Sequence, residues 1–143
     1  MVAQPEAASF WRRIAAAAYD AFLIISLWMI TTFILVMLTD QAVGGFRFQL
    51  LLYLEALFFY FTFWRIKGQT LGMQAWRIRA ENADGGIMSG VQCLIRFLAG
   101  TVSLAALGIG FLWILFNREK LAWHDIVSDS RVIYLGKRPS KKD

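Results

Sequence analysis

Asp20, Glu55 and Arg96 are ionisable residues that each lie within a different long apolar stretch of this sequence. A charge near the centre of a membrane span costs about 2.5–3.5 kcal/mol on insertion scales, and less toward the ends of the span. Such a side chain therefore finds an opposite charge, becomes neutral through hydrogen bonding, or forms part of an ion or proton site.

Asp20 and Arg96 are the natural candidates for an ion pair. If the third apolar stretch starts from the same side as the first, Arg96 enters at a depth similar to that of Asp20. Two other interpretations remain open, namely that Asp20 is an ion or proton site, or that it is a neutral, hydrogen-bonded acid. Arg13 shares a helix face with Asp20 but lies two turns away, too far for a direct bond unless both bend toward a common partner.

Glu55 has no obvious basic partner in the sequence. It is expected to be a protonated, hydrogen-bonded acid or to face water in a cavity. Together with Asp20 it is a candidate ion or proton site, because unpaired acids within spans are usually functional.

His124 and Asp125 form a second chemical candidate, next to Trp123. A His-Asp dipeptide is a weak signal, because neither a nucleophile nor a set of further metal ligands accompanies it. Asp125 is instead expected to pair with Arg12 or Arg13. We expect no enzyme activity, no metal site and no cofactor.

The apolar stretches that hold these residues indicate an integral membrane protein. Of the 143 residues, 58% are hydrophobic and only 17% are charged. The stretches at 14–38, 48–64 and 90–116 approach or exceed the 18–20 residues, roughly, that cross a bilayer core. The net charge of +5 fits basic residues beside the spans and gives no reason to expect nucleic-acid binding.

The distribution of basic residues favours a third stretch that does not simply cross. Suppose that the N-terminus is cytoplasmic and that the chain returns to the cytoplasm after the third stretch. Then 13 of the 15 Lys and Arg residues lie inside, Arg47 lies outside, and Arg96 lies within the third stretch. We therefore favour a broken or re-entrant third stretch, bent at its glycines. A plain arrangement of three spans is the alternative.

Short elements are expected outside the spans. TLGMQAW, from residue 70, suits a surface helix, WRIRA and RVIYL suit two strands that pair, and Asp84-Gly85-Gly86 suits the turn of a small hairpin. The predicted fold is an all-α membrane protein with about three hydrophobic segments and small cytoplasmic strand elements. It forms one domain over residues 1–143, with a flexible start at 1–11 and a flexible basic tail at 136–143.

These pieces together resemble the RDD family of small bacterial membrane proteins. The matching segments are RRIAAAAYDAF, GQTLGMQAWRIRAENADGG, CLIRF and LAWHDIVSDSRVIYL, in the order of the family and over nearly the whole chain. The resemblance makes Arg13, Asp20 and Asp125 the signature residues, with Arg96 as the arginine of the third segment. Arg12 competes with Arg13, but the seven-residue step to Asp20 favours Arg13.

The sequence departs from the family pattern at two places. Met73 stands where the family commonly has lysine, and Ser128-Asp129-Ser130 stands where it commonly has Gly-Thr. Both departures lie outside the signature residues, so they concern the behaviour of loops.

Two functions are compatible with these residues. The first is an oligomeric transporter or exchanger of a monovalent cation or proton in the bacterial inner membrane, as the resemblance suggests. Because three segments are few for a pathway, this function requires a homo-oligomer. The alternative is a structural or assembly protein, in which the charges only lock helices together and the surface binds other membrane proteins.

Overall fold

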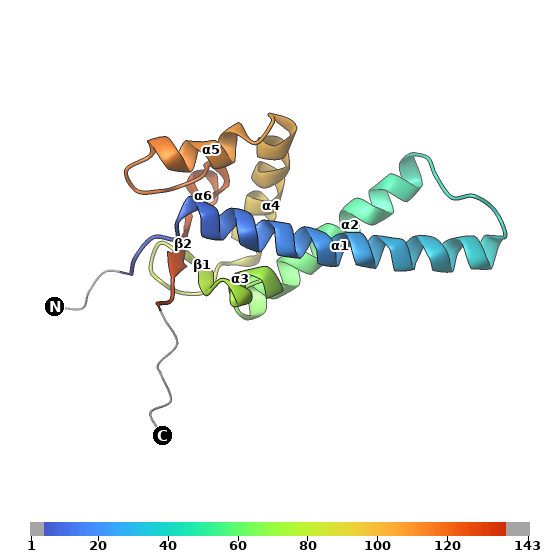
Figure 1. Ribbon diagram of the computed structural model, residues 1–143, viewed down its shortest axis with the longest axis horizontal. Helices are drawn as coiled ribbons and strands as arrows, with labels where there is room; N and C mark the ends of the chain where they lie inside the picture. The colour runs from blue at the N-terminus through green and yellow to red at the C-terminus, as the bar shows by residue number, and fades with distance from the viewer. Residues whose placement is uncertain (1–4, 137–143) are drawn as a thin grey trace, which may run out of the picture.

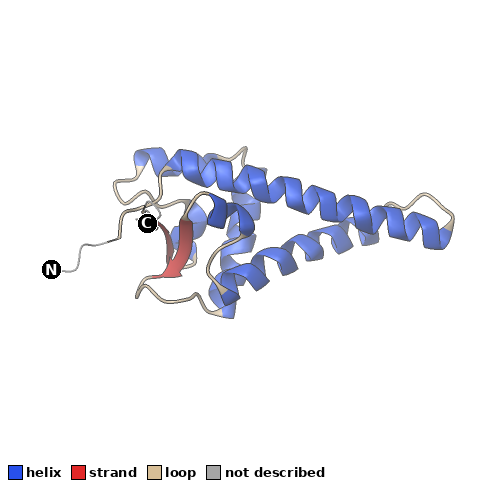
Figure 2. Ribbon diagram, turned by 60° about the horizontal axis from the view of Figure 1, so that its bottom comes forward, coloured by secondary structure: helices blue, strands red, loops and turns tan. Residues whose placement is uncertain are grey.

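Two long helices, α1 and α2, form an antiparallel hairpin (Figures 1 and 2). The computed structural model describes residues 5–136, with α1 at Phe10–Thr39 and α2 at Phe46–Ile66. Both have the length and hydropathy of membrane spans, which confirms the first two predicted spans. At 1.5 Å per residue the 30 residues of α1 extend about 45 Å, so α1 is longer than a bilayer core of about 30 Å.

If the hydrocarbon core begins at the Thr39 end of α1, the extra length belongs to the N-terminal end of the helix. Asp40 ends the helix in a left-handed conformation. A core of about 20 helical residues, counted back from Thr39, reaches Asp20. Residues 10–19 therefore extend beyond the hydrocarbon core, where Ser9 caps the helix by accepting a hydrogen bond from the backbone N–H of Arg12.

The third apolar stretch is broken, as predicted. Helix α4 spans Gly90–Ala105, helix α5 spans Ile109–Phe116, and their axes differ by 97°. The break contains two residues with positive φ, Leu107 at 59° and Gly108 at 77°. Glycine adopts this conformation without steric cost, which explains why the bend occurs at this place.

Short helices and strands from the rest of the chain pack together at the end of the α1–α2 hairpin opposite its loop, and we call this region the polar layer (Figure 1). Its strands pair antiparallel, with Ile78 opposite Tyr134 and Asn82 opposite Ser130, as expected for WRIRA and RVIYL. One face of the sheet is buried, and Ile78, Ala80 and Val132 on it are almost fully inaccessible. The elements of this layer are α3 (Leu71–Ala75), β1 (Ile78–Asn82), α6 (Trp123–Val127) and β2 (Ser130–Tyr134).

The small hairpin expected around residues 84–86 is wrong. The chain does turn there, because the Asn82 carbonyl accepts from the backbone N–H of Gly85 and the Asn82 N–H donates to the Gly86 carbonyl. However, β1 takes its partner from β2, since the chain after the turn enters α4 through the Ser89 cap. The partner of β1 is therefore the distant strand expected from RVIYL, and the turn at residues 84–86 joins β1 to α4 and not to a second strand.

The chain before α1 also reaches this sheet. Ala7 forms a bridge with Ile133, and the Ala8 N–H donates to the Val132 carbonyl at 3.0 Å. The described part of the expected flexible segment 1–11 is thus paired with β2 and continues into α1. Residues 1–4 and 137–143, which include most of the expected basic tail, lie outside the described residues.

Both ends of the α4–α5 pair contact the same polar layer. Near the start of α4, Gln92 Nε2 donates to the Ser128 carbonyl at 3.1 Å. After α5, the Lys120 carbonyl accepts from Arg13 Nη2 at 2.8 Å. The pair therefore leaves the polar layer and returns to it, which is the path expected of a re-entrant loop.

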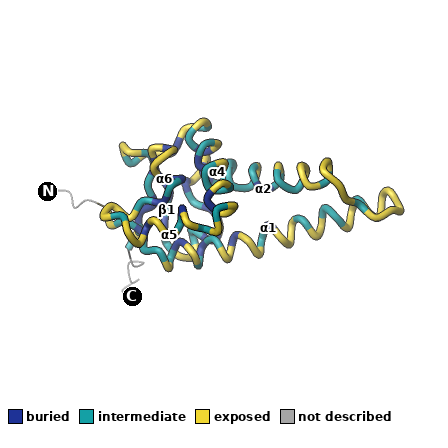
Figure 3. The backbone as a smooth tube through the Cα atoms, turned by 90° about the horizontal axis from the view of Figure 1, so that it is seen from above, coloured by how far each residue is buried: buried dark blue, intermediate teal, exposed yellow. Residues whose placement is uncertain are grey.

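Buried residues concentrate in and around the polar layer, whereas the far halves of α1 and α2 are largely exposed (Figure 3). Glycine allows the closest approach within this region. A Cβ on Gly72 of α3 would overlap the Ala16 carbonyl of α1 and lie 2.9 Å from an Asp20 oxygen. A glycine at position 72 therefore lets α3 lie directly on α1.

The re-entrant arrangement predicts which loops share a side of the membrane. Single cysteines at the exposed positions Asp84 and Glu119 should react alike with an impermeant maleimide in sealed vesicles, and a cysteine at Gln41 should react oppositely. The wild-type chain is the blank, because its one cysteine, Cys93, is fully buried. If Glu119→Cys followed Gln41→Cys, the third stretch would cross the membrane.

Candidate functional site: a charged cluster beside an apolar cavity

The carboxylate of Asp125 joins three helices. On one oxygen, Oδ1, it accepts from Nη1 of Arg96, which belongs to α4. On the other, Oδ2, it accepts from Nη1 of Arg13 in α1 at 2.5 Å and from the backbone N–H of Ala122 at 2.9 Å. We call Arg13, Arg96 and Asp125 the Asp125 cluster.

Each arginine of the cluster has a second partner in the chain that follows α5. Arg13 Nη2 reaches the Lys120 carbonyl, and Arg96 Nη1 donates to Ser130 Oγ at 2.9 Å. Ser130 in turn lies 2.6 Å from the hydroxyl of Ser128. The two serines that depart from the family pattern therefore take part in the network, which their sequence position alone did not indicate.

The Asp125 cluster is almost completely shielded from solvent. The exposed fraction is 5% for Arg13, 2% for Arg96 and 0% for Asp125. Burial alone would raise the pKa of the Asp125 carboxyl, but the guanidinium groups of Arg96 and Arg13 lower this pKa well below its usual range. Two cations and one anion leave the cluster with a net charge of +1.

His124 is neutral at physiological pH. Burial, with a further contribution from the Arg96 charge, lowers its pKa from 6.5 to about 3. Its Nε2 lies 3.8 Å from Asp125 Oδ1, and its ring packs on Phe111 with centroids 4.7 Å apart. His124 therefore places a neutral imidazole beside the Asp125 cluster and adds no charge to it.

Arg13, and not Arg12, is the arginine that pairs with Asp125. Arg12 instead donates to the Trp76 carbonyl at 3.4 Å, and its Cζ lies 4.0 Å from the centre of the Tyr134 ring. The step of seven residues that favoured Arg13 thus selects the residue on the buried face of α1.

The expected pair between Asp20 and Arg96 is wrong. Asp20 is 2% exposed, and its oxygens accept from Thr70 Oγ1 at 2.5 Å and from the Gly72 backbone N–H at 2.8 Å. Because α3 lies directly on α1, its N-terminal groups reach Asp20, while Arg96 is bonded to Asp125. Similar depth in the membrane did not bring the two side chains together.

Thr70 and Gly72 are the site residues that the sequence analysis missed. Thr70 also caps α3, because its Oγ1 accepts from the Met73 N–H at 3.2 Å. The surface helix expected in TLGMQAW is present as α3. Its use as a hydrogen-bond donor to a buried carboxylate appears only when α3 is placed against α1.

Glu55 has one neutral partner. Its Oε1 accepts from Thr31 Oγ1 at 2.6 Å, and its buried Oε2 has no partner among the described residues. Thr31 lies eight residues from the end of α1 and Glu55 nine from the start of α2, so both lie about 12–14 Å along the helices from the loop that joins them. A hydrogen-bonded acid is thus placed near mid-membrane, away from the Asp125 cluster.

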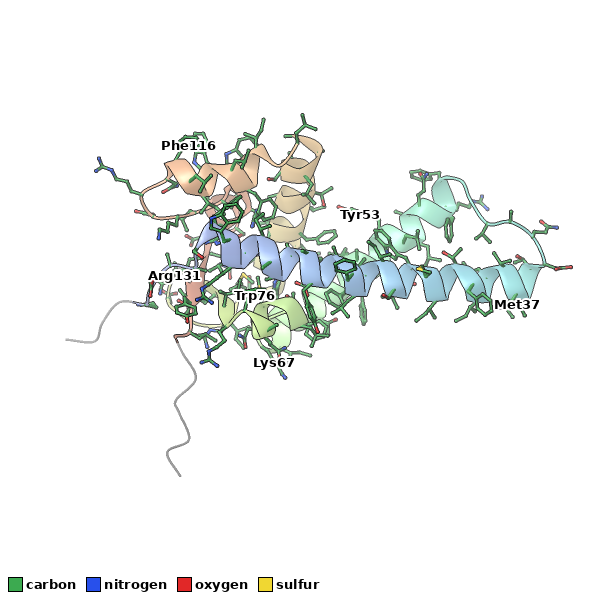
Figure 4. All side chains as sticks on the ribbon, in the orientation of Figure 1. Met37, Tyr53, Lys67, Trp76, Phe116 and Arg131 are labelled. Carbon is green, nitrogen blue, oxygen red and sulfur yellow. The ribbon has the colours of Figure 1, made fainter. Side chains whose placement is uncertain are left out.

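A cavity of about 420 Å³ lies between α1, α2 and α4, and Phe111 of α5 also lines it. Its walls are mainly aliphatic and aromatic, and its polar lining comes from few side chains, which include Asp20, Arg13, Arg96 and His124. Figure 4 labels Tyr53 on α2, where its hydroxyl lies 3.0 Å from Thr101 Oγ1 of α4 along one wall. The volume of the cavity is within the range of about 300–1,000 Å³ that is typical of ligand pockets.

Comparison with known proteins gives one family match. The chain matches the model of the RDD family over residues 7–129, which is most of its length. No curated protein and no solved structure matches this sequence.

Folding stability should depend on pH through His124. Since its pKa is about 3 in the fold and 6.5 ordinarily, the unfolded chain takes up a proton first as the pH falls. Stability should therefore decrease below pH ~6.5, by up to about 1.4 kcal/mol per pH unit. Unfolding free energies in detergent between pH 7 and 5 would measure this slope.

The substitution His124→Gln is the matching control. His124 is the single histidine of the chain, so its removal should flatten the dependence in this range. An equal slope of unfolding free energy against pH in both proteins would contradict the conclusion that His124 causes the dependence.

Proposed function

This chain belongs to the RDD family and is an integral membrane protein, and from this premise we propose that it is an oligomeric transport component that exchanges a monovalent cation or a proton. Asp20 is the proposed ion-binding carboxylate. The observation that carries the proposal is that Asp20 is buried on the wall of the cavity and has only neutral hydrogen-bond donors.

The two buried aspartates differ in the way that this function requires. Asp125 is bonded to two guanidinium groups, so its protonation would leave two arginines without a counter-ion. Asp20 has Thr70 and Gly72 as partners, and protonation or binding of a cation leaves no buried charge behind. Asp20 can therefore change its charge state at a smaller cost to the fold.

Glu55 supports a route that continues from Asp20 across the membrane. Its partner Thr31 lies eleven residues beyond Asp20 on α1, which is about 16 Å along the helix. The cavity occupies part of this interval, because Ile24 and Trp28 of α1 line it. Two acids, one at the inner edge of the core and one near its middle, are thus separated by an open volume.

A homo-oligomer belongs to this proposal. Two crossing helices and one re-entrant loop are few elements to enclose a pathway, and most of the large apolar side chains of the outer half of α1 are exposed. The basic residues of the polar layer fit a cytoplasmic N-terminus in the bacterial inner membrane by the positive-inside rule.

A structural or assembly role is the second candidate, and the Asp125 cluster favours it. Its three side chains connect α1, α4 and α6 and hold the re-entrant loop to the polar layer. In this function the charges only lock helices together, and neutralising Asp20 lowers stability or complex formation without any change in flux. The chain should then co-purify with other membrane proteins in mild detergent.

Asp20→Asn distinguishes the two functions. In proteoliposomes that contain the wild-type protein, a gradient of Na⁺ or K⁺ should drive proton movement, followed by an entrapped pH dye. The substitution should reduce this flux to the level of empty vesicles, because an amide cannot exchange a proton or balance a cation. Glu55→Gln should also reduce it.

Asp40→Asn is the matched control, because Asp40 is exposed at the other end of α1 and asparagine accepts its left-handed conformation. It should leave flux unchanged. Wild-type vesicles as tight as empty ones, or full flux in Asp20→Asn, would rule out exchange at Asp20.

A further inference from the structure

We infer that the cavity is a binding site for a single-chain amphiphile with an anionic oxygen head, a fatty-acid-like molecule that enters from the bilayer. The head binds at the Asp125 cluster and Trp64, and the apolar chain lies along the walls between α1 and α4. This inference goes beyond ion exchange and does not depend on it, because the molecule can bind whether or not the protein moves ions.

The cavity opens toward the lipid chains. Ile25 of α1 and Leu104 of α4 line it and are 49% and 67% exposed, so its apolar walls continue onto the outer surface. Residues 21–28 of α1 lie within the hydrocarbon core when about 20 residues are counted back from Thr39. An amphiphile in the bilayer can therefore reach the cavity without passing through water.

Three buried N–H donors at the inner end of the cavity have no acceptor among the described residues. They are Nε1 of Trp64, Nε of Arg13 and Nε of Arg96. All three residues line the cavity, and each is more than nine-tenths buried. Because a buried donor without a partner costs about 1–3 kcal/mol, such a group is a reason to expect an acceptor at this place.

The three donors belong to one small region. Arg13 and Arg96 bind the same carboxylate of Asp125, and Cζ of Arg96 lies 5.2 Å from the centre of the Trp64 ring. Nδ1 of His124, which also lines the cavity, has no partner either, but the three N–H groups outnumber it, so the complementary group is an acceptor such as a carboxylate or phosphate oxygen.

The charge of this region also selects an anion. The Asp125 cluster carries a net charge of +1, and His124 beside it is neutral. Asp20 lines the same cavity, but its two oxygens are bonded to Thr70 and Gly72 of the α3 segment. An anionic head at Arg96 and Trp64 is attracted by the positive charge of the Asp125 cluster, whereas a cationic head at the same place is repelled by it.

The size of the cavity selects a single chain. A volume of about 420 Å³ is near the lower end of the range for ligand pockets. Aromatic residues such as Tyr53, Tyr60 and Phe97 form the walls beyond the head region. One flexible hydrocarbon chain fits such a volume better than the two chains of a phospholipid.

Binding can be measured by native mass spectrometry of the full chain from a non-ionic detergent. The probes are palmitic acid, lysophosphatidic acid, hexadecanol and hexadecylamine, which separate the head chemistry from the chain. At least one of the two acids should bind one per chain, and at least tenfold more tightly than the alcohol or the amine. Equal binding of alcohol and acid would overturn the inference, because the head would then have no role.

Gly100→Leu tests the location. Gly100 lines the cavity, and a Cβ added there meets nothing within 4 Å, so leucine fills the cavity without a clash at the backbone. It should weaken binding of the acid at least tenfold. Leu98→Phe, two residues away on the exposed surface of α4, is the matched control and should leave binding unchanged.

Trp64→Phe tests the head contact, because it keeps an aromatic side chain and removes the unpartnered N–H. The substitution should weaken binding of the acid severalfold and leave the weak binding of hexadecanol unchanged. Unchanged acid binding in Gly100→Leu would mean that the acid adsorbs elsewhere on the apolar surface. An equal loss of acid and alcohol in Trp64→Phe would equally contradict an anion-binding head region.

Discussion

The architecture depends on one buried carboxylate that two guanidinium groups share. Asp125 binds Arg13 at the start of α1 and Arg96 in α4, and it lies on α6, which leads into β2. Burying such charges is expensive, and their mutual attraction offsets the cost only when the geometry satisfies them all. The chain meets most of this condition with a backbone N–H, a backbone carbonyl and a serine hydroxyl around the cluster, and leaves Nε of Arg13 and Nε of Arg96 without an acceptor among the described residues. The cluster thereby fixes where the third apolar stretch must return.

The return of this stretch explains the rest of the molecule. Because α4 and α5 begin and end at the polar layer, they do not fill the space beside α1 as a straight span would. A cavity remains between the helices, with the cluster at one end and apolar walls beyond it. The same arrangement separates the two buried aspartates. Asp125 is held by charges, whereas Asp20 is held by the neutral groups of the α3 segment.

The sequence is sufficient to predict the elements of this fold, because membrane spans and strands have strong local patterns. The two long helices, the break near Gly108 and the pairing of β1 with β2 all follow from apolar length, glycine position and the need of an isolated strand for a partner. Charge counting favoured a returning chain, and both ends of the α4–α5 pair do contact the polar layer. The hairpin at residues 84–86 was wrong because a turn signal does not reveal whether the chain after it continues as a strand or, as here, as a helix.

The partners within the site were less predictable. Asp20 and Arg96 have similar expected depths, but depth does not determine which faces of two helices meet. Their true partners depend on the approach of α3 to α1 at Gly72 and on the path of the chain after α5, and both are tertiary features. The most direct test of the Asp125 cluster as the organising contact is the unfolding free energy of Asp125→Asn in mixed micelles, with the exposed Asp129→Asn as control. We predict a loss of about 3–5 kcal/mol for Asp125→Asn and less than about 0.5 kcal/mol for the control. Equal stability of the two variants would contradict the account.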